Sequence, residues 1–153
     1  MEIKVLAEDT SNSPAFRSEH GLSLYIETKG SKILFDMGAS DLFLENAKKL
    51  NVNIKDIDLA VISHGHYDHG GGLKAFLNEN NKAKVYVNQK AFGNHYSKKS
   101  ERVSYIGLDK NLEKHDRIVL TDGVFLINPD LLLFSWVTGN ELLSSCNNSL
   151  FAE

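Results

Sequence analysis

Residues 63–72 read Ser-His-Gly-His-Tyr-Asp-His-Gly-Gly-Gly, and this stretch holds three of the chain's six histidines. Residues 58–62, just before it, are an apolar run of strand length, and residues 72–77 carry apolar side chains at helical spacing. The order predicts a loop that joins a strand to a helix, with glycines that let the backbone turn tightly. The rest of the fold is expected to be arranged around this loop.

The spacing of the polar side chains in this loop predicts a metal site. In extended backbone, side chains two residues apart point the same way, so His64 and His66 can converge on one point, with Asp68 two residues further on. Imidazole nitrogens suit zinc, and a carboxylate adds a harder ligand for the same ion or a second one. The alternative is a polar surface loop with solvated histidines, but such a loop does not require four ligand-type residues with built-in glycines. The predicted ligands of one or two divalent ions, zinc first and manganese or iron as alternatives, are His64, His66, Asp68 and His69.

The pattern His64-x-His66-x-Asp68-His69 after a short apolar strand resembles the metal-binding signature of the metallo-β-lactamase superfamily. Residues 19–23 (EHGLS) and 34–38 (LFDMG) look most like the branch grouped with dihydropterin-aminobenzene phosphate synthases, and the matches run in order from residue 1 to about 140. The resemblance implies an α/β (α+β) fold: an αββα sandwich with a mixed sheet and flanking helices, which holds its metal between two sheets.

The resemblance also implies roles for particular residues. His64 and His66 would hold a first ion, Asp68 and His69 a second, and Asp68 would also orient the attacking water as the catalytic residue. Asp36 closes an apolar strand, where an unpaired carboxylate is costly. It matches a family aspartate that lies just outside the metal ligands and helps to order the histidine loop.

The family pattern is not complete in this chain. The resemblance implies a second half with a third histidine for the first ion, a bridging aspartate and a last histidine, yet no histidine follows His115. Asp116, Asp122 and Asp130 lie in or beside predicted turns, and His115 lies in a charged loop. We therefore expect a half-site that binds metal with weak or absent hydrolysis, in one domain over residues 1–153 that is incomplete at its C-terminus. Three explanations are compatible with this pattern: a truncated gene product, a fragment, or a protomer that recruits its missing ligands from another chain.

Composition narrows the class of protein. With 42% hydrophobic and 24% charged residues the chain is ordinary globular material. A net charge of −3 argues against a nucleic-acid or anionic-membrane partner, since such binders usually carry a basic stripe. The sequence has neither an apolar run of 18 residues nor an N-terminal signal pattern, so a cytoplasmic location is expected. Cys146 is the single cysteine and cannot form a disulfide within the chain.

Alternation, turn residues and helical spacing predict the remaining elements. A turn at 29–31 should make the third strand antiparallel to the second, and an exposed loop at 8–21 should precede the second. Ser40 or Asp41 should cap the helix. A turn at 121–123 should join two of the later strands. The predicted helix covers 42–50, and the predicted strands cover 1–6, 22–28, 32–36, 83–87, 103–106, 117–120, 124–127 and 131–137.

Two histidines outside the motif are candidates for a substrate pocket. Residues 88–104 are polar and basic, with interleaved aromatic side chains and His95. They form either a wall of the active-site mouth for an anionic, ring-bearing substrate or a solvated excursion. By resemblance to the family, His20 overhangs the metal site, although an isolated histidine before a strand is more often a surface residue.

Two classes of function follow. One is a metal-dependent hydrolase that acts on an ester, phosphoester or related small molecule; the other is a non-catalytic metal-binding or interaction protein derived from such an enzyme. Strand 131–137 is apolar almost throughout, which predicts burial on both faces. A chain that leaves this surface uncovered is expected to form a homo-oligomer, most simply a symmetric dimer.

Overall fold

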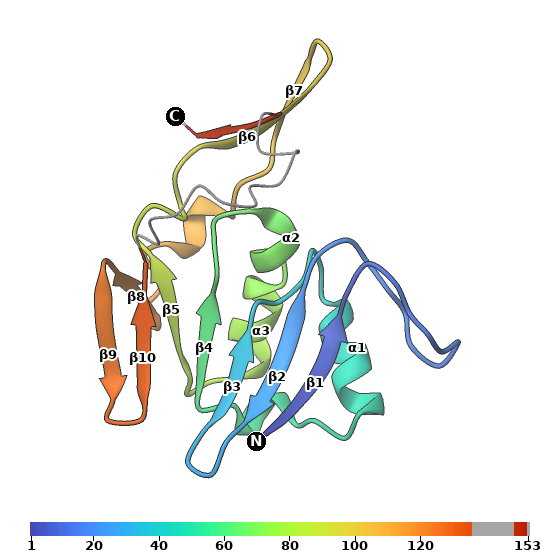
Figure 1. Ribbon diagram of the computed structural model, residues 1–153, viewed down its shortest axis with the longest axis vertical. Coiled ribbons are helices and arrows are strands. Elements are labelled where there is room, and N and C mark those ends of the chain that lie inside the picture. Colours follow the sequence, from blue (N-terminus) through green and yellow to red (C-terminus); the bar gives the residue numbers. More distant parts are fainter. Residues whose placement is uncertain (136–148, 153) are drawn as a thin grey trace.

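A six-stranded mixed sheet forms the centre of the protein in the computed structural model, which describes residues 1–135 and 149–152 (Figure 1). The strand order is β1-β2-β3-β4-β5-β8, with β1 to β3 antiparallel and β3, β4, β5 and β8 parallel. The strands are β1 (Glu2–Ala7), β2 (Ser23–Glu27), β3 (Lys32–Phe35), β4 (Leu59–Ile62), β5 (Lys84–Asn88) and β8 (Ile118–Thr121). The mixed α/β architecture predicted from the sequence is confirmed.

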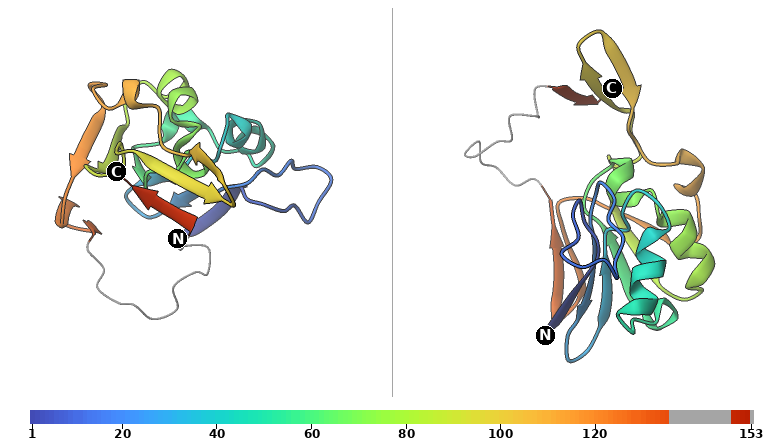
Figure 2. Two further views of the ribbon diagram at one scale, coloured as in Figure 1. Left: turned by 90° about the horizontal axis from the view of Figure 1, so that it is seen from above. Right: turned by 90° about the vertical axis from the view of Figure 1, so that its right-hand side faces the viewer.

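The helices cover one face of this sheet (Figures 1 and 2). They are α1 (Leu42–Lys49), α2 (Tyr67–Gly70) and α3 (Leu73–Glu79), with single 3₁₀ turns at Ile54–Asp56 and Lys110–Leu112. Phe43 from α1 and Phe76 from α3 are fully buried beside Leu34 and Val85 of the sheet. Each such side chain contributes roughly 1.5–3 kcal/mol by leaving water. The predicted helix at 42–50 is therefore present, and the Ser40 hydroxyl accepts a hydrogen bond from the Leu42 amide at its start (3.1 Å).

The other face of the sheet is partly covered by a hairpin of β9 (Val124–Asn128) and β10 (Leu131–Phe134). Burial on both faces of the strand predicted at 131–137 is wrong for its described part, because Leu132 is 49% exposed and Phe134 is 68% exposed. The strand has only one covered side: Leu131 and Leu133 pack on the sheet, and the alternate residues face outward. Residues 136 and 137 lie outside the described residues, as does Cys146.

The polar stretch at 88–104 is not a loop throughout. It contains β6 (His95–Lys99), which pairs with β7 (Arg102–Tyr105) and with β11 (Leu150–Ala152). This small sheet projects from the end of the main sheet at which α2 lies (Figure 1). The predicted turn at 121–123 leads from β8 in the main sheet to β9 in the hairpin. No described helix is long and apolar enough to cross a membrane.

Candidate metal centre

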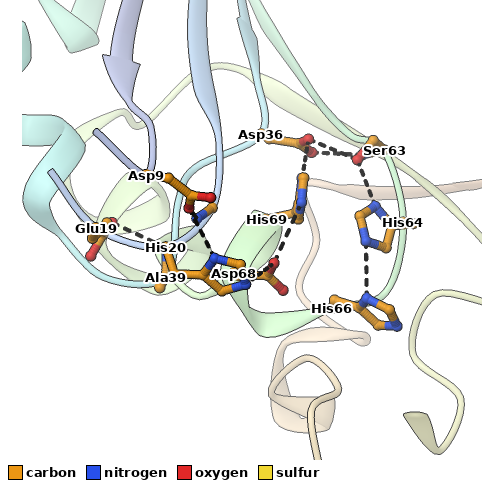
Figure 3. Close-up of polar contacts among 11 residues, drawn as sticks. Asp9, Glu19, His20, Asp36, Ala39, Ser63, His64, His66, Asp68 and His69 are labelled. Atoms are coloured by element: carbon orange, nitrogen blue, oxygen red, sulfur yellow. Dashed lines mark hydrogen bonds and ion pairs between the residues drawn. The ribbon is translucent and has the colours of Figure 1, made fainter. Parts of the chain in front are cut away.

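The histidine loop, residues 63–69, follows β4 and runs into the first turn of α2 (Figure 3). Its backbone packs so closely on residues 91–95 that a Cβ added at Gly65 would lie 2.1 Å from the Ala91 carbonyl oxygen. His66 then adopts an extended conformation just before α2 begins. The predicted strand–loop–helix is confirmed, and glycine is required at position 65 because no side chain fits there.

The loop brings two ring nitrogens together. His64 Nε2 lies 3.1 Å from His66 Nδ1, and the two ring centroids are 4.5 Å apart. With zinc–nitrogen bonds of about 2.0–2.1 Å, two ligands of a tetrahedral ion have nitrogens roughly 3.3 Å apart. The separation between these two nitrogens therefore fits a pair of ligands on one ion.

Buried Asp36 organises the loop from below. Its carboxylate accepts hydrogen bonds from the Ser63 amide, the Ser63 hydroxyl and His69 Nδ1, all at 2.7 Å. It is fully buried and has a left-handed φ of 57°, which aspartate tolerates better than most residues. The bond from His69 Nδ1 leaves His69 Nε2 on the outer side of the ring, 3.6 Å from Asp68 Oδ2.

Ser63 sets the tautomer of His64. The Ser63 hydroxyl donates its one hydrogen to Asp36, so it acts as an acceptor toward His64 Nδ1, which lies 2.9 Å away. His64 Nδ1 therefore carries the hydrogen, and His64 Nε2 keeps the lone pair that a metal would need. Sequence reasoning missed Ser63, because its partner Asp36 lies 27 residues away in the sequence.

His20 reaches the same centre from the 8–21 loop. Its Nε2 lies 3.4 Å from Asp68 Oδ2, and its Nδ1 lies 2.9 Å from Asp9 Oδ1, which also accepts from the Gly21 amide (3.1 Å). The two carboxylates thus hold opposite edges of one imidazole. Asp9 was not predicted, and a polar loop rich in turn formers gives no signal that would single it out.

His95 lies beside the centre on its other side. The ring centroids of His95 and His66 are 5.5 Å apart, and His95 Nε2 donates to the Lys90 carbonyl (3.2 Å). By contrast His115, far along the chain, pairs with Asp116 in a charged loop (2.9 Å).

The histidines of the cluster differ in the direction of their pKa shifts. Burial, with the neighbouring His69 and His66, lowers the pKa of His64 to about 4, and burial also lowers the pKa of His66. Burial acts in the same direction on His69, but the hydrogen bond and charge of Asp36 prevail and raise its pKa. His64 is therefore a neutral imidazole near pH 7.

The donor set fits a divalent ion in its chemistry, and its nearest pair fits in distance. Across residues 1–135 and 149–152, however, no three His, Cys, Asp or Glu side chains already enclose a common point. His64 and His66 face each other, whereas the Asp68 carboxylate is turned toward His20 and His69. The described side chains therefore form two ligand pairs, His64 with His66 and Asp68 with His69, rather than one three-ligand set.

Comparison with known proteins agrees with this arrangement. The family model described as the metallo-β-lactamase superfamily matches residues 18–137. The crystal structure of a metal-dependent hydrolase of the β-lactamase superfamily aligns with a TM-score of 0.75 and 34% identity, over 99% of this chain and 53% of that one.

Two curated relatives come from Methanocaldococcus jannaschii. One is a 7,8-dihydropterin-6-methyl-4-(β-D-ribofuranosyl)-aminobenzene-5′-phosphate synthase, 45% identical over 54% of this chain and 30% of its own length. The other, an uncharacterized protein, is 31% identical over 88% of this chain and 53% of its own. The chain thus spans about half or less of the length of the relatives it matches.

Proposed function

The chain belongs to the metallo-β-lactamase superfamily, and on that premise we propose that it is a metal-dependent hydrolase of small-molecule esters or phosphoesters. Members of this superfamily typically bind divalent metals, and we propose zinc here, with manganese or iron as alternatives. The observation that carries the proposal is the pair His64 Nε2 and His66 Nδ1 at 3.1 Å, with the His64 lone pair freed by Ser63 and Asp36.

In the proposed site, His64 and His66 hold a first ion, and Asp68 with His69 holds a second. A bound divalent ion would lower the pKa of a coordinated water to about 7. Asp68 would orient that water, and its carboxylate would accept the proton that the water loses. Asp36 keeps His69 in the tautomer that presents Nε2 outward, and His20 restrains the outer side of the Asp68 carboxylate.

The substrate class follows from the relative whose name contains a 5′-phosphate product and from the basic stretch near the site. We propose that the substrate is a small anionic molecule. His20 and His95 flank the proposed ligands on opposite sides, which supports a place for both in the substrate pocket.

The alternative is a metal-binding or interaction protein without turnover. It is favoured by one observation: the side chains that the structure describes offer no preassembled three-ligand set, and catalytic zinc sites usually have three protein ligands.

Metal content and turnover, measured on the same samples, test the proposal. We expect the purified chain to bind zinc in calorimetric titration and to hydrolyse bis-(p-nitrophenyl) phosphate slowly in a metal-dependent manner. His66→Ala should lose zinc binding, and Asp68→Asn should lose turnover. His115→Ala is the matched control, because His115 pairs with Asp116 away from the centre.

Equal zinc binding by the His66→Ala and His115→Ala variants would refute the metal site. Zinc binding without turnover on phosphodiester, phosphomonoester and lactone substrates would favour the alternative.

A further inference from the structure

The β6–β7 hairpin has two chemically different faces. Ser97 pairs with Ser104 and Lys99 with Arg102, so these four side chains share one face of the two strands. The opposite face is aromatic: Tyr96 contacts Tyr105 and stacks on Phe151, with ring centroids 5.7 and 5.4 Å apart. The aromatic face also carries Lys98 and Val103, whereas the two serines, Lys99 and Arg102 lie on the other side.

The polar face lines a pocket of about 250 Å³. Its walls are Tyr67, Ser97, Lys99, Arg102, Ser104 and Ile106. Tyr67 stands between two proposed metal ligands in the sequence, and its amide donates to the Ile106 carbonyl (2.8 Å). His66 and Gly107 form an adjoining antiparallel bridge. The pocket therefore lies next to the candidate metal centre: Tyr67 lines the pocket, and main-chain contacts at residues 66 and 67 connect the histidine loop to the hairpin.

The two cations of the pocket have no counter-ion in the described part of the chain. Neither Lys99 nor Arg102 makes an ion pair or a side-chain hydrogen bond within residues 1–135 and 149–152. They are paired across the hairpin and face the same space, where like charges repel. An anion in the pocket would remove that repulsion.

We propose that this pocket binds a phosphate group. It offers three hydroxyl-bearing side chains, an ammonium and a guanidinium, and the last of these can bind two oxygens at once. A phosphate monoester presents three free oxygens to such a set, whereas a carboxylate presents two. The shape of the donor set therefore favours phosphate over carboxylate.

The phosphate bound here is an anchor rather than the reacting group. Arg102 lies four residues before Ile106 along an extended strand, a span of roughly 13 Å, and Ile106 is the residue bonded to the histidine loop. The inference rests on the proposed function in one respect: the anchored molecule is taken to be the substrate, which must reach from this pocket to the metal centre. It follows that the substrate carries a phosphate at a distance from the bond that is hydrolysed.

Calorimetric titration of the full chain with inorganic phosphate tests the site directly. We expect saturable binding that falls about tenfold for each charge-assisted contact removed, in Lys99→Gln, in Arg102→Gln and further in the double variant. Lys98→Gln is the matched control, because it removes the same charge from the other face of the same strand. It should change the affinity by less than about twofold, and acetate should bind more weakly than phosphate.

Several outcomes overturn the proposal. They are absence of saturable binding at millimolar phosphate, an equal loss in Lys98→Gln, and loss of phosphate binding in His66→Ala, which would place the anion on the metal. The binding test does not depend on hydrolysis, so a chain without turnover that still binds phosphate through Arg102 refutes only the proposed function.

If hydrolysis is observed, kinetics add a second test. Arg102→Gln should raise KM for an ester with a phosphate tail, leave kcat unchanged within about twofold, and leave a neutral ester unaffected. A fall in kcat on both substrates would overturn the anchoring role.

Discussion

The histidine loop and the β9–β10 hairpin are both attached to the main sheet, but by different kinds of interaction. The loop is held by directional bonds, three of them to one buried carboxylate at 2.7 Å. The hairpin is held by apolar packing of Ile127, Leu131 and Leu133, with its other face exposed. Directional hydrogen bonds fix the position and orientation of each side chain, whereas apolar packing mainly determines which face of the hairpin is covered. The first region is therefore expected to be far less tolerant of substitution than the second.

The strongest test of this difference is removal of the Asp36 carboxylate. Asp36→Ala leaves three donors without their partner and places alanine at a left-handed φ, so we expect a loss of at least about 3 kcal/mol in the free energy of unfolding. Zinc affinity should fall by roughly 10–100-fold. Urea denaturation and calorimetry measure the two effects.

Asp36→Asn is the control for the backbone, because asparagine also tolerates left-handed φ. It should retain more stability than Asp36→Ala. If Asp36→Ala were as stable as the wild type, the loop would not depend on this carboxylate.

A smaller effect is expected from crowding the loop. In Gly65→Ala the new Cβ would lie 2.1 Å from the Ala91 oxygen and 2.4 Å from His95 Nε2, so the loop must shift, at a cost of about 1–3 kcal/mol and with weaker zinc binding. Gly30→Ala, in the β2–β3 turn, meets nothing within 4 Å and should stay within about 0.5 kcal/mol. Thermal or urea unfolding measures the free energy of unfolding of both variants. Equal values would contradict the close packing of Gly65 on Ala91.

The loop should also make the metal-free protein sensitive to acid. The pKa of His64 is about 4 in the folded state and 6.5 in the unfolded state, so between these values the unfolded chain binds more protons. Stability from His64 is present above pH 6.5 and is lost as the pH falls toward 4. His69, whose pKa is raised, acts in the opposite sense and loses its contribution as the pH rises.

The comparison of wild type with His64→Gln isolates the His64 contribution. The difference in unfolding free energy between pH 4.5 and pH 7 should be about 1 kcal/mol larger in the wild type, a figure discounted for partial exposure. An identical pH dependence of the two proteins would show that His64 titrates normally.

The smallest effect on stability is expected on the outer face of the β9–β10 hairpin. Phe134→Ser should change the free energy of unfolding of the monomer by less than about 0.5 kcal/mol, because Phe134 is 68% exposed. Leu133→Ser, one residue away on the packed face, should cost more. Homo-oligomer formation stays a prediction: light scattering over a concentration series should show self-association that Phe134→Ser weakens. A concentration-independent monomer mass would contradict it.

The sequence predicted the histidine loop well because its signal is local. A strand, histidines spaced by glycines and a helix follow one another directly, and this order determines the backbone path. The partners of the loop were harder to predict, since Asp36 joins Ser63 and His69 across 27 and 33 residues, and Asp9 reaches His20 from within a loop. Only the family resemblance connected Asp36 to the loop in advance.

Hydrophobicity alone misjudged the burial of the strand predicted at 131–137. An apolar run at 131–134 is compatible with one covered face or two, and the choice depends on which elements lie opposite it. The strand predicted at 103–106 is present as β7, but its partner β6 was missed. Ser97 and Lys99 lie on one face and Tyr96 on the other, but Lys98 on the aromatic face interrupts the alternation, so the segment looked irregular and basic.

The joint between the β6–β7 hairpin and the histidine loop is made by main-chain atoms, at His66 with Gly107 and at Tyr67 with Ile106. Main-chain bonds of this kind survive most changes of side chain. The residues of the hairpin can therefore be exchanged during evolution while the neighbouring histidines keep their positions. Related proteins that share this loop can therefore acquire new substrate preferences through substitutions in the projecting β6–β7 hairpin alone.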